Sequence, residues 1–240
     1  MITLHTRLGL SDIAWGAGMG GRGSKKRVLC FGDSLTAGYR KAKESTPYGT
    51  QLRERLGEKY EVVVSGVPGE TTGEMVVRIE EVIKKAKEGG GRMFDLAVVL
   101  GGTNDVARKV PAEEVMANLT AIHQALHAEG CKTIALGIPQ HYQMFMHGGY
   151  FAQVRDTINE SLEKLSLSVH AIRAQQMTFL TLDPRLPYFD PTTTTPSELH
   201  SDLWDDGIHF SEKGYTQLGT CVADHILNNH ILEPLRNRPK

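Results

Sequence analysis

The feature that most constrains this chain is the regular alternation of short apolar runs with longer segments of helical spacing. Short apolar runs bounded by turn residues are typical of buried strands, and apolar residues three or four apart are typical of amphipathic helices. The runs predict strands at residues 27–31, 60–65, 94–100, 133–138 and 177–182. The spacing predicts helices over residues 47–56, 71–87, 111–129, 150–167 and 211–228.

Strands that alternate with helices predict right-handed crossovers and a mostly parallel sheet. A length of 240 residues suits one α/β domain with a full core and is short for two. Because Gly16 to Lys26 is rich in glycine and then basic, residues 1–25 are predicted to be a tail. The domain is expected over residues 26–230, followed by a second tail at 231–240.

The charge balance limits the partners. Lys and Arg number 27 and Asp and Glu 28, so a net charge of -1 gives no reason to expect nucleic acid or an anionic membrane surface. No apolar run approaches the roughly 20 residues of a membrane span. The N-terminus lacks the apolar core of a secretory signal, so a cytoplasmic location is the default expectation, with a weak organelle-targeting tail left open. The oligomeric state is left unknown.

Polar residues suited to acyl transfer follow three of the predicted strands. In parallel sheets, ligands bind beyond the carboxyl ends of the strands. Ser34 follows the first strand and begins the next helix, where backbone N–H groups are free. Gly66 follows the second strand, and Asn104 follows the third with its side-chain amide. Donors from Ser34, Gly66 and Asn104 would form an oxyanion hole.

A nucleophilic serine needs a base, and the candidate is His209, directly before the last helix. Asp206, three residues earlier, can fold back onto the other ring nitrogen and fix the tautomer. Asp202 and Asp205 compete with Asp206 for this role. Other interpretations stay open: Ser34 as a plain helix cap, and Asn104 and its neighbour Asp105 as turn residues.

These blocks occur in the order Gly32-Asp33-Ser34-Leu35, the glycine block at Gly66, Gly102-Thr103-Asn104-Asp105, and Asp206-Gly207-Ile208-His209. In this order the chain resembles the GDSL/SGNH hydrolase family over roughly residues 27–229. The resemblance implies a flavodoxin-like, three-layer α/β/α sandwich with a five-stranded sheet, and ester hydrolysis through an acyl-enzyme. It implies Ser34 as nucleophile, His209 as base, Asp206 as its partner, and Ser34, Gly66 and Asn104 as oxyanion donors. Val64 departs from the family, where many members carry asparagine.

Three functions are compatible with these residues. The first is hydrolysis of a small-molecule ester, whether a short acyl ester, an O-acetyl group or a thioester. The second is acyl transfer by the same residues, and the third is a non-catalytic binding module. No cofactor or metal is expected, because His123 and His127 lack the acidic pair of a zinc motif and are predicted to lie on a solvated helix face. Residues 141–147 could line an acyl pocket or form a surface flap.

The cysteines are few and odd in number. Cys30, Cys131 and Cys221 each lie in an apolar stretch, so they are predicted to be buried free thiols rather than a disulfide framework.

Overall fold

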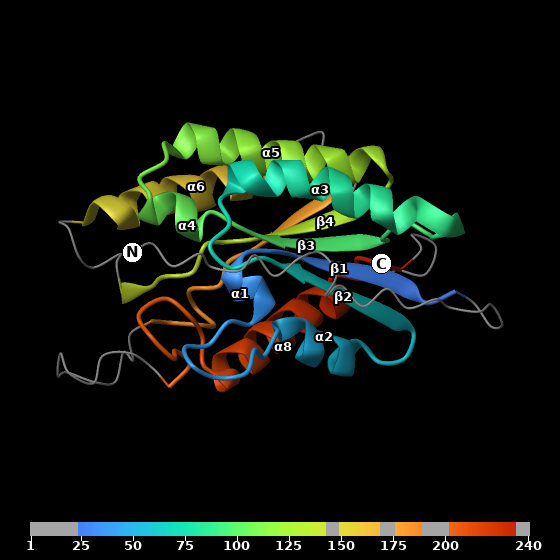
Figure 1. Cartoon of the computed structure of the whole chain (residues 1–240), viewed down its shortest axis with the longest axis horizontal. Helices are drawn as coiled ribbons and strands as arrows, with labels where there is room; N and C mark the ends of the chain where they lie inside the picture. The colour runs from blue at the N-terminus through green and yellow to red at the C-terminus, as the bar shows by residue number, and fades with distance from the viewer. Residues whose placement is uncertain (1–23, 143–148, 169–175, 189–201, 234–240) are drawn as a thin grey trace, which may run out of the picture.

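The computed structural model describes residues 24–142, 149–168, 176–188 and 202–233, and shows a parallel sheet covered by helices on both faces (Figure 1). The sheet has five strands in the order β2-β1-β3-β4-β5, and all four neighbouring pairs are parallel. The strands are β1 (Lys26–Gly32), β2 (Tyr60–Gly66), β3 (Leu96–Leu100), β4 (Lys132–Leu136) and β5 (Met177–Leu180). The three-layer α/β prediction is thereby confirmed.

The central strands β1 and β3 carry continuous apolar runs, because both faces of the sheet are buried there. In β1, Leu29 and Phe31 belong to one core cluster, whereas Val28 and Cys30 belong to the other. This is the two-residue alternation of a strand with a helix layer on each side. β3 is buried at every position, which accounts for its continuous apolar sequence.

One layer consists of α3 (Thr72–Lys87), α4 (Thr103–Ala107), α5 (Ala112–Ala128) and α6 (Tyr150–Ser166), above the sheet in Figure 1. The start of α3 is fixed by a capping box, in which the Thr71 hydroxyl accepts from the Glu74 N–H and the Glu74 carboxylate accepts from the Thr71 N–H. Met75, Ile79, Val82 and Ile83 of α3 then face the core. A short 3-10 turn, η2 (Glu88–Gly90), follows α3.

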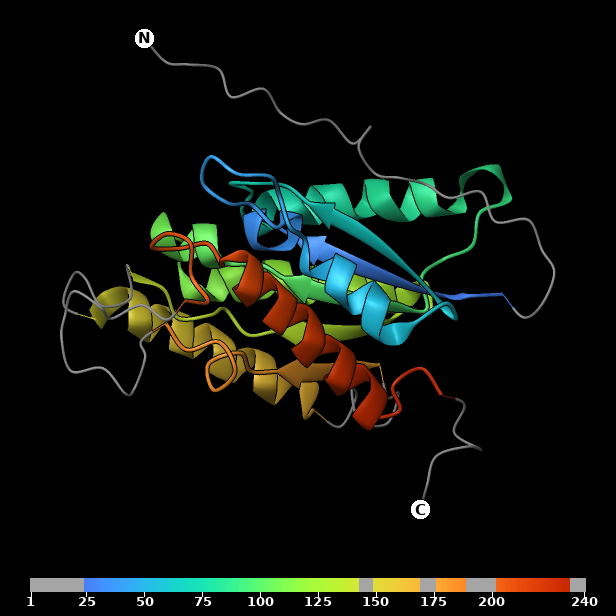
Figure 2. The same cartoon turned by 90° about the horizontal axis from the view of Figure 1, so that it is seen from below.

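The other layer consists of α1 (Ser34–Ala37), α2 (Tyr48–Leu56) and α8 (Glu212–Asn228). They lie below the sheet in Figure 1, and Figure 2, the view from below, shows α2 and α8 side by side in front of it. Leu52, Leu218 and Val222 are buried in this second core cluster. Ile231 also packs into it, so the buried chain continues slightly past the predicted boundary at residue 230.

Two sequence predictions about single side chains have different outcomes. Cys30, Cys131 and Cys221 are buried free thiols, as predicted. The solvated helix face predicted for His123 and His127 is wrong for His123, which is only 2% exposed. The polar pattern of α5 suggested solvent, but α3 and α6 both pack against α5 and cover this residue. Within the described residues, no helix is long and apolar enough to cross a membrane.

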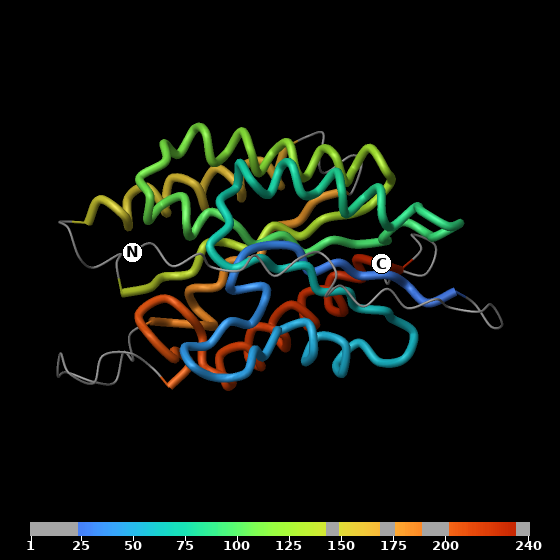
Figure 3. Tube along the Cα trace, in the orientation of Figure 1, coloured from blue at the N-terminus to red at the C-terminus, as the bar shows by residue number. Residues whose placement is uncertain are grey.

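The segments predicted to carry chemistry meet at one end of the sheet. In Figure 3, the chain enters β1 on the right and reaches the loop and α1 on the left. The orange-red loop before α8 lies at this same end, although it comes from the far end of the sequence. Because all strands are parallel, this end is the carboxyl edge of the sheet.

Candidate active site

Ser34 is the first residue of α1, immediately beyond the end of β1, and is 6% exposed. Asp33 caps this helix: its Oδ1 accepts from the Leu35 N–H at 2.9 Å. The backbone oxygen of Asp33 accepts from the N–H groups of Thr36 and Ala37. These bonds occupy the other donors of the first turn, so the Ser34 N–H is the one that a ligand can use.

His209 lies beside Ser34, although 175 positions separate the two residues. His209 Nε2 is 3.0 Å from Ser34 Oγ, and His209 Nδ1 is 2.9 Å from Asp206 Oδ2. An ionised carboxylate only accepts, so Nδ1 carries the proton and Nε2 is left to accept from the serine hydroxyl. The structure therefore brings the three predicted residues into one hydrogen-bonded chain.

Asp206 is held as the ionised partner of this chain. Its burial alone would raise its pKa, but hydrogen bonds from the His209 ring and from the N–H groups of His209 and Ile208 outweigh burial and lower the pKa. Both backbone N–H groups donate to Oδ1 at 2.7 Å. The carboxylate is thus oriented by the same loop that carries the histidine.

The three competing aspartates have different partners. Asp205 accepts from the backbone N–H of Lys41 at 3.0 Å and pairs with the Lys43 ammonium. Asp202 pairs with Lys213 on the surface. Of these three carboxylates, only that of Asp206 bonds to the His209 ring, as the three-residue spacing predicts.

The loop that carries Asp206 and His209 is closed at its base. Trp204 and Phe210 form an antiparallel bridge, and their rings pack at 4.3 Å between centroids. Inside this bridge, the Asp205 N–H donates to the His209 oxygen at 2.9 Å. We call residues 204–210 the acid–base loop. Its closed base and the bonds between Asp206 and His209 hold the two residues in one local structure.

Asn104 lies in the first turn of α4, directly after β3. Its Nδ2 donates to the backbone oxygen of Glu70 at 2.9 Å and lies 3.4 Å from Asp33 Oδ2. The amide is therefore beside the residue that precedes Ser34, at the edge where it was predicted. Its donor is directed at the turn that follows β2.

Gly66 lies at the end of β2, opposite Gly32 of β1. The Val67 N–H donates to the Gly32 oxygen. In a parallel ladder, the residue in register with Gly32, here Gly66, then directs its own N–H to the opposite side of its strand. The Gly66 N–H therefore points away from β1. The glycine itself is needed for packing, because a Cβ there would lie 2.2 Å from the Ala37 nitrogen.

A second glycine of this block was not singled out from the sequence. Val67-Pro68-Gly69-Glu70 forms a turn in which the Glu70 N–H donates to the Val67 oxygen and Gly69 has a φ of +80°. Proline followed by glycine is the signature of a type II turn, so this signal was present in the sequence. The Gly69 N–H has no acceptor among the described residues. The turn lies beside Asn104, which binds the oxygen of Glu70.

Comparison with known proteins bears on this geometry. A model of the GDSL-like lipase/acylhydrolase family matches residues 30–217, which include every block described above. The chain belongs to this family. Its sequence matches none of the curated proteins with which it was compared.

Solved structures of GDSL-type proteins have the same fold. A lipase/acylhydrolase from Enterococcus faecalis is 20% identical with a TM-score of 0.63, covering 85% of this chain and 96% of its own. An aryl esterase from M. smegmatis is 18% identical with a TM-score of 0.61, covering 85% and 99%. A GDSL-like lipase from Bacteroides thetaiotaomicron is 18% identical with a TM-score of 0.59, covering 85% and 89%. At this identity, the likeness extends to the fold.

Two tyrosines border the acid–base loop of this GDSL-like chain. The Tyr39 ring lies 4.6 Å from the His209 ring and remains 39% exposed. Tyr142, after β4, donates its backbone N–H to the Gly207 oxygen and is 49% exposed. These aromatic side chains form the open rim of the site. The pocket-or-flap prediction for residues 141–147 falls largely on 143–148, outside the described residues.

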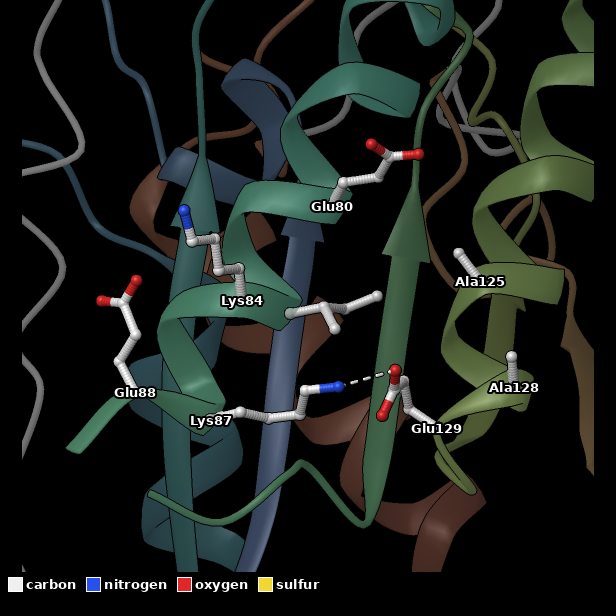
Figure 4. Close-up of a pocket in the computed structure, with 8 residues that line it drawn as sticks. Glu80, Lys84, Lys87, Glu88, Ala125, Ala128 and Glu129 are labelled. Atoms are coloured by element: carbon white, nitrogen blue, oxygen red, sulfur yellow. Dashed lines mark hydrogen bonds and ion pairs between the residues drawn. The ribbon is translucent and has the colours of Figure 1, made fainter. Parts of the chain in front are cut away.

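A groove of about 550 Å³ lies elsewhere, between α3 and α5 (Figure 4). It is lined by Ile83 and Ala125 and by charged side chains, among which Lys87 and Glu129 form an ion pair at 2.8 Å. These residues come from the C-terminal halves of both helices, which run antiparallel to the strands and therefore end at the amino edge of the sheet. The groove is separate from Ser34. Within the described residues, no cluster of three or more metal-ligating side chains occurs.

Proposed function

We propose that this chain hydrolyses carboxylic esters through an acyl-enzyme, with Ser34 as the nucleophile. The observation that carries the proposal is the hydrogen-bonded chain from Ser34 Oγ through His209 to Asp206, with distances of 3.0 and 2.9 Å. A serine hydroxyl is weak as a nucleophile until a base within hydrogen-bond reach removes its proton. Membership of the acylhydrolase family supports the same chemistry.

In acylation, His209 Nε2 takes the proton of Ser34 as Oγ attacks the acyl carbonyl. The imidazolium that forms is stabilised by the Asp206 carboxylate on Nδ1. His209 then donates the proton to the departing alcohol. In deacylation, water enters and the same steps run with His209 again as base. Each step needs only residues already in contact.

The negative charge that forms on the acyl oxygen needs hydrogen-bond donors close to Ser34, at the carboxyl edge of the sheet. The Ser34 N–H and the Asn104 amide supply two of them in the proposal. For the third donor, we propose Gly69 in place of the predicted Gly66. The Gly69 N–H has no acceptor among the described residues, whereas the hydrogen-bond pattern of β2 directs the Gly66 N–H away from β1. The Asn104 amide then exchanges its bond to the Glu70 oxygen for one to the substrate.

Two exposed tyrosines beside the site support an acyl or aryl ester as the substrate class. The exposed rings of Tyr39 and Tyr142 stand beside the acid–base loop and offer apolar and stacking contacts to an acyl or aryl group. Similar solved structures include an aryl esterase and a lipase/acylhydrolase, which agrees with small esters as substrates.

The test is turnover of p-nitrophenyl esters of increasing chain length, with acetylated sugars and acyl-CoA in the same panel. A fluorophosphonate should label the wild-type protein once, and Ser34→Ala should abolish both labelling and turnover. Added alcohols measure how much of the acyl group goes to an acceptor other than water. A folded wild-type chain that is unlabelled and inert toward the whole panel would instead indicate a binding module.

A further inference from the structure

Arg78, in the middle of α3, is an arginine inside the protein, at 7% exposure. Its ion-pair partner Glu70 is 8% exposed. Burying two charges removes them from water at a cost that mutual attraction often only offsets. A buried pair of this kind is therefore weak evidence for a stabilising role, and its contacts have to be considered for another one.

The guanidinium joins three separate segments. Arg78 Nε donates to Glu70 Oε1 at 2.7 Å, in the turn after β2. Nη1 donates to Ser65 Oγ at 2.6 Å, near the end of β2. Nη2 donates to the backbone oxygen of Gly32 at 2.9 Å, at the end of β1. The plane of the group also lies over the Phe31 ring, with its central carbon 4.1 Å from the ring centroid. A fixed fork of donors is suited to holding three acceptors in one geometry.

Each of these segments leads directly to the candidate oxyanion donors. Gly32 stands two residues before Ser34 on the same backbone. The backbone oxygen of Glu70 accepts from the Asn104 amide, and Glu70 directly follows Gly69. Arg78 makes no hydrogen bond to Ser34 or His209 among those of the described residues, so it acts through its neighbours.

We propose that the Arg78–Glu70 pair is a positioning pair, which locks the end of β1 to the turn after β2 and thereby sets the spacing between the Ser34 N–H and the donors at residues 69 and 104. This inference rests on the proposed ester hydrolysis. An oxyanion hole works because its donors are preorganised. A small displacement of one strand end relative to the other therefore reduces the stabilisation of the transition state more than it reduces the affinity for substrate.

The chain supplies a matched control at the other end of the same strand. Arg27 of β1 is 8% exposed, pairs with Glu61 at 3.3 Å, and lies over the Phe94 ring at 4.7 Å. It thus repeats the buried arginine, the glutamate and the aromatic ring, but at the amino edge of the sheet. Arg27→Lys reports what weakening such a pair does to the fold alone.

The experiment compares Arg78→Lys, Glu70→Gln and the milder Ser65→Ala with Arg27→Lys, at a temperature where each is folded by circular dichroism. With p-nitrophenyl acetate, kcat should fall about 10-fold to 100-fold in Arg78→Lys and Glu70→Gln while KM changes by less than about 3-fold. Ser65→Ala should fall by only a few-fold. The affinity for phenylboronic acid, whose tetrahedral adduct on serine mimics the oxyanion, should weaken in parallel with kcat.

The proposal is overturned if Arg78→Lys and Glu70→Gln keep the wild-type kcat and boronate affinity. It is equally overturned if Arg27→Lys loses as much as Arg78→Lys, because the effect then belongs to the fold. A wild type that turns over no ester contradicts the proposed function and not the pair. Hydrogen exchange then decides: the segments 32–37 and 66–71 should exchange faster in Arg78→Lys than in Arg27→Lys, and equal rates would refute positioning.

Should Arg78→Lys not fold, Glu70→Gln and Ser65→Ala carry the same comparison. Ser65→Ala removes a single hydroxyl from the network and leaves the ion pair in place. A fall in kcat with unchanged KM in these two variants supports positioning, and wild-type kcat in both refutes it.

Discussion

His209 Nε2 lies 3.0 Å from Ser34 Oγ, although 175 positions of sequence separate the two residues. His209→Gln should therefore lower kcat for p-nitrophenyl acetate about 1,000-fold, because the serine loses its base. The control is His225→Gln on α8, since His225 binds Thr178 at 3.0 Å and lies outside the site. Similar losses in the two variants would argue against His209 as the base.

The choice among neighbouring aspartates can be tested directly. Asp206→Asn should lower kcat about 1,000-fold or more, because the amide no longer holds the tautomer and cannot stabilise the imidazolium. Asp205→Asn should change kcat by only a few-fold, because the Asp205 carboxylate binds Lys41 and Lys43 and not the His209 ring. Steady-state kinetics on the two purified variants give the answer, and equal kcat values would remove Asp206 from the mechanism.

Removing the Asn104 amide should act on the transition state. We expect Asn104→Ala to lower kcat about 100-fold with a small change in KM, which is the usual effect of losing one oxyanion donor. Asn118→Ala is the control, because this amide also serves the start of α3, where Nδ2 donates to Thr72 Oγ1 at 3.2 Å. If KM rises while kcat stays constant, Asn104 binds substrate without stabilising the oxyanion.

The two glycines of the second block should respond differently to alanine. Gly66→Ala places a Cβ 2.2 Å from the Ala37 nitrogen, so Tm should fall sharply. Gly69→Ala has no atom within 4 Å of the added carbon, and its φ of +80° costs about 1–2 kcal/mol in an alanine. Gly69→Ala should thus fold but lose kcat as the turn shifts. A wild-type kcat in Gly69→Ala would contradict Gly69 as the third oxyanion donor.

His123 makes a prediction about acid stability. Burial lowers its pKa from 6.5 to about 3, and within the described residues neither ring nitrogen has a hydrogen-bond partner. Between these pH values the unfolded chain binds a proton that the folded chain does not, so the free energy of unfolding falls as pH drops below 6.5. His123→Leu removes this dependence.

Urea denaturation should show His123→Leu gaining about 2 kcal/mol more over the wild type at pH 5 than at pH 8, from about 1.4 kcal/mol per pH unit. A gain at pH 8 as well is expected, because two unpartnered nitrogens leave the core. The same difference at both pH values would mean that the His123 ring titrates normally in the folded protein.

The strands and the order of the site residues could be predicted because both produce recognisable local patterns in the sequence. A strand buried on two faces is apolar along its length, and Asp206 and His209 are close enough in the chain for spacing to matter. The strand-end rule then placed Ser34 and Asn104 at one edge.

The features that the sequence did not predict depend on the hydrogen-bond pattern between strands and on tertiary contacts. The Gly66 N–H points away from β1 because Val67, and not Gly66, donates to the Gly32 oxygen, and a sequence does not contain that hydrogen-bond phase. Arg78 stands between Val77 and Ile79 in α3, and this local sequence gives no sign that its acceptors are strand ends. His123 is buried by helices from other parts of the chain.

The closed base of the acid–base loop also orders events during synthesis. Ser34 and its strand leave the ribosome early, whereas the bridge between Trp204 and Phe210 forms only when residues 204–210 have emerged. Because that bridge holds acid and base together, a nascent chain has a serine without a base for most of its translation. The proposed hydrolysis therefore becomes possible only after this loop docks and α8 packs against α2.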